Sequence, residues 1–141
     1  MESQTAAPHT GSCLCRAIGF EIHGVLAPIQ VCHCLDCRKA QGGPLATNIP
    51  VAVADFRIVS GEDHLKVFAS SPGKERLFCA TCGAPIFSRR ADTPGVLRLR
   101  AGTLDAPVQA RLASHAYTAD KAGWWEISDD LPQYPRAHPP G

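Results

Sequence analysis

The chain has 141 residues, 45% of them hydrophobic, and its 14 basic and 13 acidic side chains leave a formal net charge of +1. This size and composition are typical of one globular domain and exclude a disordered chain. The near-neutral charge argues against nucleic acid or an anionic membrane surface as a partner. No apolar run approaches the roughly 20 residues of a membrane-spanning helix, so we expect no membrane association.

Residues 1–10 contain Glu2 and show neither a positively charged region nor an apolar run. They therefore resemble a flexible tail and not a signal peptide. We expect the protein to be cytoplasmic, where thiols stay reduced.

Short strands separated by turn residues follow this tail. Residues 17–23 alternate between apolar and polar side chains, which predicts a half-buried strand. The segment Ser70-Ser71-Pro72-Gly73 predicts a hairpin turn. One helical turn is expected over residues 35–40. Further strands are expected over residues 29–34, 45–49, 51–53, 56–59, 65–69, 74–78, 85–89, 96–101 and 113–118.

The prolines near the C-terminus indicate an extended, Pro-rich tail over residues 136–141. We therefore predict a single mainly β domain over residues 11–135, with a short tail at each end.

The seven cysteines fall into three tight clusters. An odd number of cysteines in a reducing compartment fits a disulfide framework poorly. Buried free cysteines are an alternative, but the close pairs argue against it. The clusters are Cys13-x-Cys15, Cys32-x-Cys34-x-x-Cys37 and Cys79-x-x-Cys82. They divide into four thiols and three, which suggests one closed zinc site and one open zinc site.

The pair Cys79 and Cys82 has the spacing of a zinc knuckle, in which two intervening residues let both sulfurs reach one ion. Gly83 permits the positive φ that closing such a turn often requires. A tetrahedral zinc needs a second pair, which Cys13 and Cys15 can supply. This site would tie the N-terminal strand to the middle of the chain.

Cys32, Cys34 and Cys37 offer three thiolates, which leave one coordination position of a zinc ion free for water or a substrate. A thiol that binds there loses its proton and becomes a nucleophile suited to an aldehyde carbon. His33 lies between two ligands in an extended segment and should point away from them. An iron–sulfur cluster would lack its fourth ligand.

Taken in order, the clusters resemble the glutathione-dependent formaldehyde-activating enzyme family, which includes centromere protein V-like proteins. The resemblance includes Gly11-Ser12 before the first cluster, Arg38-Lys39 after the second and Gly83 after the third. The stretches Ser114-His115-Ala116, Asp120-Lys121, Trp124-Trp125 and Asp130 to Pro135 extend it, so that it covers about residues 10 to 135.

The resemblance implies an Mss4-like fold of small antiparallel sheets around a structural zinc at Cys13, Cys15, Cys79 and Cys82. It also implies a catalytic-type zinc at Cys32, Cys34 and Cys37, giving two zinc ions per chain, with full occupancy of the second left open. The implied activity is carbon–sulfur lyase chemistry, the reversible joining of glutathione and formaldehyde to S-(hydroxymethyl)glutathione.

Glutathione is an anion, so its pocket needs cations. The candidate substrate-binding residues are Arg38, Lys39, Arg98, Arg100 and Trp124, and the candidate proton donors are His115 and Tyr117. For the strand arginines we favour a solvated outer face, and for Arg38-Lys39 a solvated turn is equally compatible. We expect at least one ring of the tryptophan pair to fill the core, and His115 could be a hydrogen-bonded core residue.

The leading hypothesis is a zinc-dependent lyase that acts on glutathione, or another thiol, and on formaldehyde or a related aldehyde. The alternative is a non-catalytic zinc module that binds a small thiol metabolite or a protein. Nucleic-acid binding, suggested by the centromere-type relatives, is opposed by the near-neutral charge and by the lack of a basic tail. The oligomeric state is left open.

Overall fold

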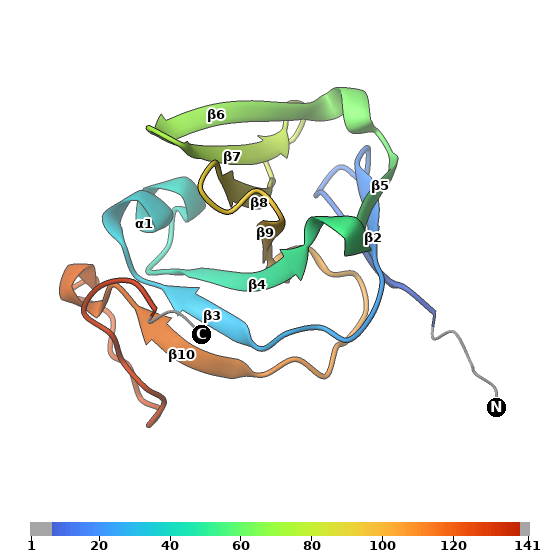
Figure 1. Ribbon diagram of the computed structural model, residues 1–141. Coiled ribbons are helices and arrows are strands. Elements are labelled where there is room, and N and C mark those ends of the chain that lie inside the picture. Colours follow the sequence, from blue (N-terminus) through green and yellow to red (C-terminus); the bar gives the residue numbers. More distant parts are fainter. Residues whose placement is uncertain (1–6, 139–141) are drawn as a thin grey trace, which may run out of the picture.

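The computed structural model describes residues 7–138 and confirms the prediction of a mainly β chain (Figure 1). The strands are β1 (His9–Ser12), β2 (Gly19–Ile22), β3 (Ile29–Cys32), β4 (Ala46–Ala52), β5 (Phe56–Ser60), β6 (Leu65–Ser71), β7 (Lys74–Cys79), β8 (Pro85–Arg90), β9 (Val96–Arg100) and β10 (Leu112–Ala116). The helices are α1 (Leu35–Gln41) and the short 3-10 turns η1 (Val53–Asp55), η2 (Glu62–His64), η3 (Ala101–Thr103) and η4 (Thr118–Asp120). Over residues 7–138, no helix has the length and apolar character to cross a membrane.

Two sheets form the structure. The larger sheet has the strand order β10-β3-β4-β9-β8-β7-β6, and the smaller has the order β1-β2-β5. Neighbouring strands run antiparallel except for β10 and β3, which run parallel. The larger sheet curves from β10 at the bottom of Figure 1 to the β6–β7 hairpin at its top. That hairpin confirms the predicted turn, because Ser71 lies opposite Lys74.

The two faces of the larger sheet differ in polarity because side chains alternate along each strand. One face carries apolar side chains, among them Ile49 and Leu99, which join the core with Phe20 of the smaller sheet. The ring of Phe56 links the sheets, with its centroid 5.4 Å from that of Phe20 and 5.2 Å from that of Phe87. Burial of such side chains contributes about 1.5–3 kcal/mol each.

The opposite face of the larger sheet carries polar side chains in cross-strand register. Gln30 lies opposite Asn48, and Asn48 lies opposite Arg100. In the next row, Ser88 lies between Arg98 and Arg76. This polar face is the one on which α1 and the second cysteine cluster lie.

The ends of the domain differ from the predicted boundaries. Strand β1 begins at His9, inside the expected tail of residues 1–10, of which residues 1–6 lie outside the described part. At the other end, the Tyr117 N–H donates to the Arg136 carbonyl, and His138 is hydrogen-bonded to Ser114. Residues 136–138 therefore lie along β10 and do not form a free tail, whereas 139–141 lie outside the described residues.

Gly61, after β5, generates the first testable prediction. Its φ is +73°, and a Cβ there would overlap the Ala17 carbonyl in the chain that leads into β2. We expect Gly61→Ala to lower the free energy of unfolding by about 3 kcal/mol. The cost of a left-handed backbone at alanine adds to the cost of the overlap between the new Cβ and the Ala17 carbonyl. Chemical denaturation of the zinc-loaded protein measures this loss.

Gly24→Ala is the matched control, because Gly24 has φ +91° and open space around a Cβ. It should cost only the backbone strain, about 1–2 kcal/mol. Equal losses for the two variants would contradict the close approach of Gly61 to Ala17.

Candidate functional site

The first candidate metal centre is the four-thiol cluster of Cys13, Cys15, Cys79 and Cys82, whose sulfurs all lie within 4.8 Å of one another. The Cys13–Cys15 and Cys15–Cys79 sulfur separations are 3.6 Å and 3.8 Å. Four sulfurs about 2.3 Å from a zinc ion at the corners of a tetrahedron lie about 3.8 Å apart. The cluster therefore has the dimensions of a closed zinc site.

Backbone N–H groups surround these sulfurs. The Ile18 N–H donates to the Cys13 sulfur over 3.3 Å, and the Thr81 N–H donates to the Cys79 sulfur over 3.4 Å. Gly83 has φ +80°, the positive value expected for the turn, and its N–H donates to the Cys79 carbonyl. Backbone N–H groups also lower the pKa of Cys82 to about 6. These contacts favour the thiolate form of Cys13 and Cys82, the form that binds metal. The Ala17 N–H lowers the pKa of Cys15, but burial and hydrogen bonds with the other three cysteines outweigh it and raise that pKa to about 11.

The second candidate metal centre is the three-thiol cluster of Cys32, Cys34 and Cys37, at the junction between β3 and α1. Cys34 is the N-cap of α1, and its sulfur accepts the Cys37 N–H over 3.3 Å. The three sulfurs also lie within 4.8 Å of one another, and within residues 7–138 no further histidine, cysteine or carboxylate joins the group. A zinc ion held here would keep one coordination position open.

Two arginines lie beside the three-thiol cluster. Both terminal nitrogens of Arg76 are 3.9 Å from the Cys37 sulfur. Arg100 is only 4% exposed, and its guanidinium donates to Asn48, Ser88 and Gln41. Hydrogen bonds from the neighbouring cysteines, assisted by the charges of Arg76 and Arg100, lower the pKa of Cys37 to about 2. Hydrogen bonds with Cys34 and Cys37, in turn, raise the pKa of Cys32. The half-buried Arg76 and the buried Arg100 thus place positive charge beside the one thiol of this cluster whose pKa is lowered.

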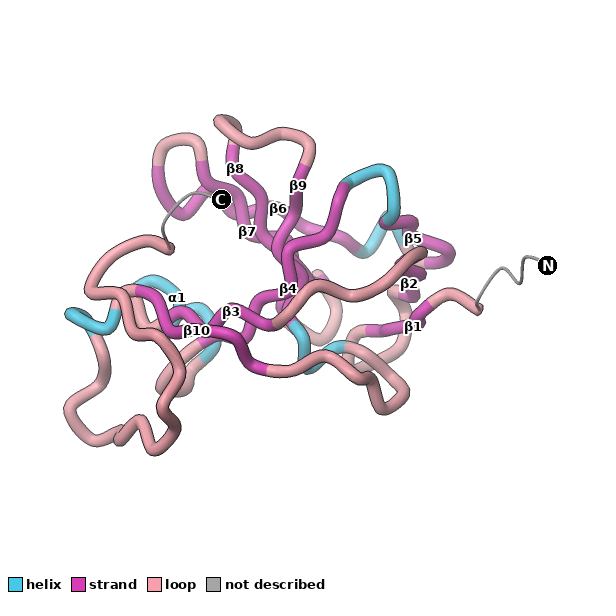
Figure 2. Tube along the Cα trace, turned by 60° about the horizontal axis from the view of Figure 1, so that its bottom comes forward, coloured by secondary structure: helices cyan, strands magenta, loops and turns pink. Residues whose placement is uncertain are grey.

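The three-thiol cluster opens into a cavity of about 770 Å³, here called the thiol cavity. Its floor is the polar face of the larger sheet, and its other walls are formed by residues from the start of α1 and from residues 117–138, here called the C-terminal segment. In Figure 2 this segment lies beside β10 and α1. The polar side chains around the thiols are Gln30, Asp36, Asn48, Ser71, Lys74, Arg76, Arg90, Arg98, Tyr117, Asp120 and His138.

A buried histidine pair lies behind the three-thiol cluster. His33 is fully buried, and its Nε2 is 2.9 Å from His115 Nδ1. The other ring nitrogen of His115 is 2.9 Å from the Asp129 carboxylate. His33 thus points away from the thiols, as expected from its extended segment. This chain of hydrogen bonds, here called the histidine latch, ties the metal-binding loop to the C-terminal segment.

The structure places two of the predicted substrate-binding candidates, Arg98 and Arg100, and one of the candidate proton donors, Tyr117, at the thiol cavity. Arg98 and Tyr117 line it, and Arg100 lies beneath the thiols. The expectation of a solvated outer face is therefore wrong for Arg100. His115 is a buried member of the histidine latch, and it does not line the cavity.

Other candidates lie elsewhere. Arg38 and Lys39 are on α1 and do not line the thiol cavity. Trp124 and Trp125 are 70% and 40% exposed and line a separate, more open cavity with Lys121. The expectation that one tryptophan ring fills the core is therefore wrong, and Trp124 does not face the thiols.

Lys74 and Arg76 line the thiol cavity but are not among the residues predicted from sequence to bind substrate. The alternation in β7 was a usable signal, because Lys74 and Arg76 share one strand face while Leu77 points to the core. Asp129 had no comparable signal, since it lies in a loop and meets His115 only in the folded chain.

The histidine latch leads to a prediction about metal affinity. We expect His115→Leu to weaken zinc binding at the three-thiol cluster about tenfold, because His115 holds His33, which lies between the ligands Cys32 and Cys34, and loss of groups that position metal ligands has effects of this size. Chelator competition followed by elemental analysis measures both sites in one sample. The four-thiol cluster is the internal control, and its affinity should not change. If zinc binding weakens equally at both sites, or at neither, the histidine latch does not support the three-thiol cluster.

Comparisons with known proteins agree with this geometry. The family described as glutathione-dependent formaldehyde-activating enzyme matches residues 8–120. An uncharacterized lyase of Schizosaccharomyces pombe is 29% identical over 79 residues, or 56% of each chain. A putative glutathione-dependent formaldehyde-activating enzyme of Aspergillus flavus is 25% identical over 116 residues, which are 81% of this chain and 54% of the relative. The chain thus spans about half the length of these curated relatives.

A crystal structure of a Rhodobacter sphaeroides protein has the same fold. It superimposes with a TM-score of 0.60 at 24% sequence identity and covers 71% of this chain and 91% of its own. The match over residues 8–120 and the two cysteine clusters together establish that the chain belongs to the glutathione-dependent formaldehyde-activating enzyme family.

Proposed function

We propose that the protein is a zinc-dependent carbon–sulfur lyase that reversibly joins a small thiol, such as glutathione, to an aldehyde in the thiol cavity. One observation carries this proposal: three cysteine sulfurs open into a cavity whose walls also carry Lys74, Arg76 and Arg98. The thiols and the cations that could bind an anion therefore line the same cavity.

The thiol half of the reaction depends on the metal and on the cations. Cys32, Cys34 and Cys37 would hold a zinc ion, whose open coordination position would lower the pKa of an incoming thiol. Arg76 lies against Cys37 and offsets the charge of the three thiolates, so that a second anion can approach. The four-thiol cluster, by contrast, has no open position and serves the fold.

Arg98 is the best-supported anchor for the substrate carboxylates. It lines the thiol cavity, and its buried Nη1 has no hydrogen-bond partner within residues 7–138. A buried donor without a partner is costly, and the charge of a carboxylate bound at the accessible part of the same guanidinium would compensate this cost. Lys74, at the edge of the same cavity, adds a second positive charge.

Tyr117 is the candidate proton donor for the product oxygen. It lines the thiol cavity and adopts φ +57°, a left-handed conformation that is uncommon outside glycine. Such backbone strain persists only where surrounding contacts impose it, and it clusters at functional sites. Here those contacts include hydrogen bonds from the backbone of Tyr117 and Thr118 to the C-terminal segment.

Exchange spectroscopy tests the reaction. We expect the zinc-loaded protein to accelerate exchange between glutathione, formaldehyde and their adduct above the spontaneous rate, as measured by magnetisation-exchange NMR. Cys34→Ser should remove this acceleration because it takes away one of the three sulfurs that would hold the zinc ion. Zinc retained at the four-thiol cluster would show that the fold of the variant is intact. Glutathione binding without any acceleration would support the non-catalytic zinc module instead.

Calorimetric titration with glutathione tests the anchor. Arg98→Met should weaken binding about tenfold, since a hydrogen bond to a charged group contributes about 1.5–3 kcal/mol. Arg111→Met is the matched control, because Arg111 is an exposed arginine that does not line the thiol cavity. If both variants bind glutathione like the wild type, Arg98 is not the anchor.

A further inference from the structure

His138 lines the thiol cavity and belongs to the part of the chain that follows the family match over residues 8–120. Its ring Nδ1 is 3.0 Å from the hydroxyl oxygen of Ser114 on β10. The ring also packs against Tyr134, with 5.7 Å between the centroids. Because Ser114 is buried and the imidazole is half-buried, these two contacts hold the ring in one orientation.

Strand register places this imidazole on the face of the sheet that carries the thiols. Ser114 lies opposite Gln30 of β3, and Gln30 lies opposite Asn48 of β4, so the three residues form one row across the polar face. Cys32 follows Gln30 by two residues, roughly 7 Å further along the same strand. This separation is small enough for a proton to pass between a thiol bound at the three-thiol cluster and the imidazole, directly or through one water molecule.

The second ring nitrogen of His138, Nε2, is available for proton transfer. It has no hydrogen-bond partner within residues 7–138 and is not one of the buried unpartnered atoms of that range, so a ligand or water can reach it. When the proton of the neutral ring is on Nδ1, that N–H donates to Ser114 and Nε2 carries a lone pair. The same hydrogen bond persists after Nε2 takes up a proton, so proton uptake requires no rearrangement.

The surroundings of His138 favour its neutral form. Burial lowers the pKa of His138, and the charges of Arg98 on β9 and His115 on β10 lower it further. A neutral imidazole at neutral pH is the form that a general base requires. Besides the three thiols and Arg98, the titratable side chains that line the thiol cavity with it are Asp36, Lys74, Arg76, Arg90, Tyr117 and Asp120.

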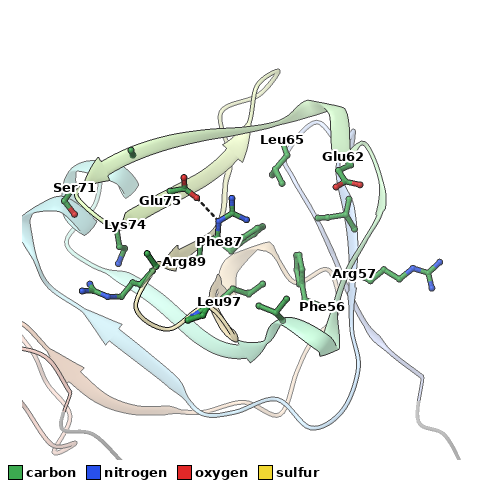
Figure 3. Close-up of a pocket in the computed structure, with 17 residues that line it drawn as sticks. Phe56, Arg57, Glu62, Leu65, Ser71, Lys74, Glu75, Phe87, Arg89 and Leu97 are labelled. Carbon is green, nitrogen blue, oxygen red and sulfur yellow. Dashed lines mark hydrogen bonds and ion pairs between the residues drawn. The ribbon is translucent and has the colours of Figure 1, made fainter.

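A cavity of about 770 Å³ on the opposite face of the larger sheet supplies no competing proton acceptor. Figure 3 shows Phe87 and Leu97 among the residues that line it. Both alternate along their strands with residues of the polar face, namely Ser88 and Arg98. The sheet therefore separates the carboxylates of this cavity, such as that of Glu75, from the thiols.

We propose that His138, oriented by Ser114, is the proton acceptor for the substrate thiol in the thiol cavity. This inference rests on the proposed function. The sulfur–hydrogen bond of the thiol breaks, its proton passes to Nε2 of His138, and a carbon–sulfur bond forms at the carbonyl carbon. Tyr117 protonates the former carbonyl oxygen, and the imidazolium returns its proton to Tyr117. Sulfur has then lost one proton and oxygen has gained one, without an oxidant or a reductant.

The pH dependence of glutathione–formaldehyde exchange tests this assignment in zinc-loaded protein, with the spontaneous rate subtracted at each pH. Wild-type kcat/KM should fall at acid pH as His138 becomes protonated, with a midpoint below the ordinary pKa of histidine. His138→Gln should lower kcat/KM about a hundredfold at neutral pH, the size of effect typical of a general base, and should remove this acid limb. His23→Gln is the matched control, because His23 is exposed and does not line the thiol cavity, and it should change neither.

Ring-nitrogen NMR tests the same assignment without any chemistry. Long-range ¹H–¹⁵N spectra of the zinc-loaded protein should show neutral His138 with its proton on Nδ1, and Ser114→Ala should give a mixture of the two tautomers. Addition of glutathione without an aldehyde should shift the Nε2 signal of His138 and leave that of His23 unchanged.

The outcomes separate this inference from the lyase. If His138→Gln keeps the wild-type kcat/KM, or loses rate with an unchanged acid limb, His138 is not the proton acceptor and the lyase stands. A proton fixed on Nε2 of neutral His138, or an Nε2 signal that glutathione does not shift, overturns the assignment in the same way. If the wild-type protein does not accelerate exchange at any pH, the lyase itself is overturned, and the role of His138 with it.

Discussion

The structure depends on the meeting of two cysteine pairs that lie far apart in the sequence. Cys15 and Cys79 are 64 residues apart, yet their sulfurs lie 3.8 Å from each other. This contact joins the end of β1, in the smaller sheet, to the end of β7, in the larger one. With the two sheets fixed in this way, the apolar face of the larger sheet packs against Phe20 and Ile22, and its polar face is left to form the thiol cavity.

The polar face and the three-thiol cluster depend on each other. A guanidinium as buried as that of Arg100 is costly unless hydrogen bonds and opposite charge compensate it. Asn48 and Ser88 provide the hydrogen bonds, and the nearby thiolates provide the charge. The thiolates in turn need cations, because three of them exceed the charge of one zinc ion. This balance of charge explains why Arg100 can be buried at this position.

Features that depend on neighbouring residues in the sequence could be predicted. They include the β6–β7 hairpin, the positive φ of Gly83 and the grouping of the cysteines into a cluster of four and a cluster of three. Features that depend on which strands become neighbours could not. Arg76 reaches Cys37 only because the curved sheet brings β7 near α1. The exposure of Trp124 follows from the path of its loop, which composition does not encode.

The parallel pairing of β3 with β10 sets an order for assembly. The metal-binding loop after β3 is supported by His115, which lies 82 residues further along the chain than His33. During synthesis the three thiols therefore emerge long before the strand, the latch and the C-terminal segment that hold them. Contacts of such sequence separation slow folding, because the intervening chain must be ordered first. In the nascent chain these cysteines therefore lack the support of His115 until β10 has been synthesised and has paired with β3.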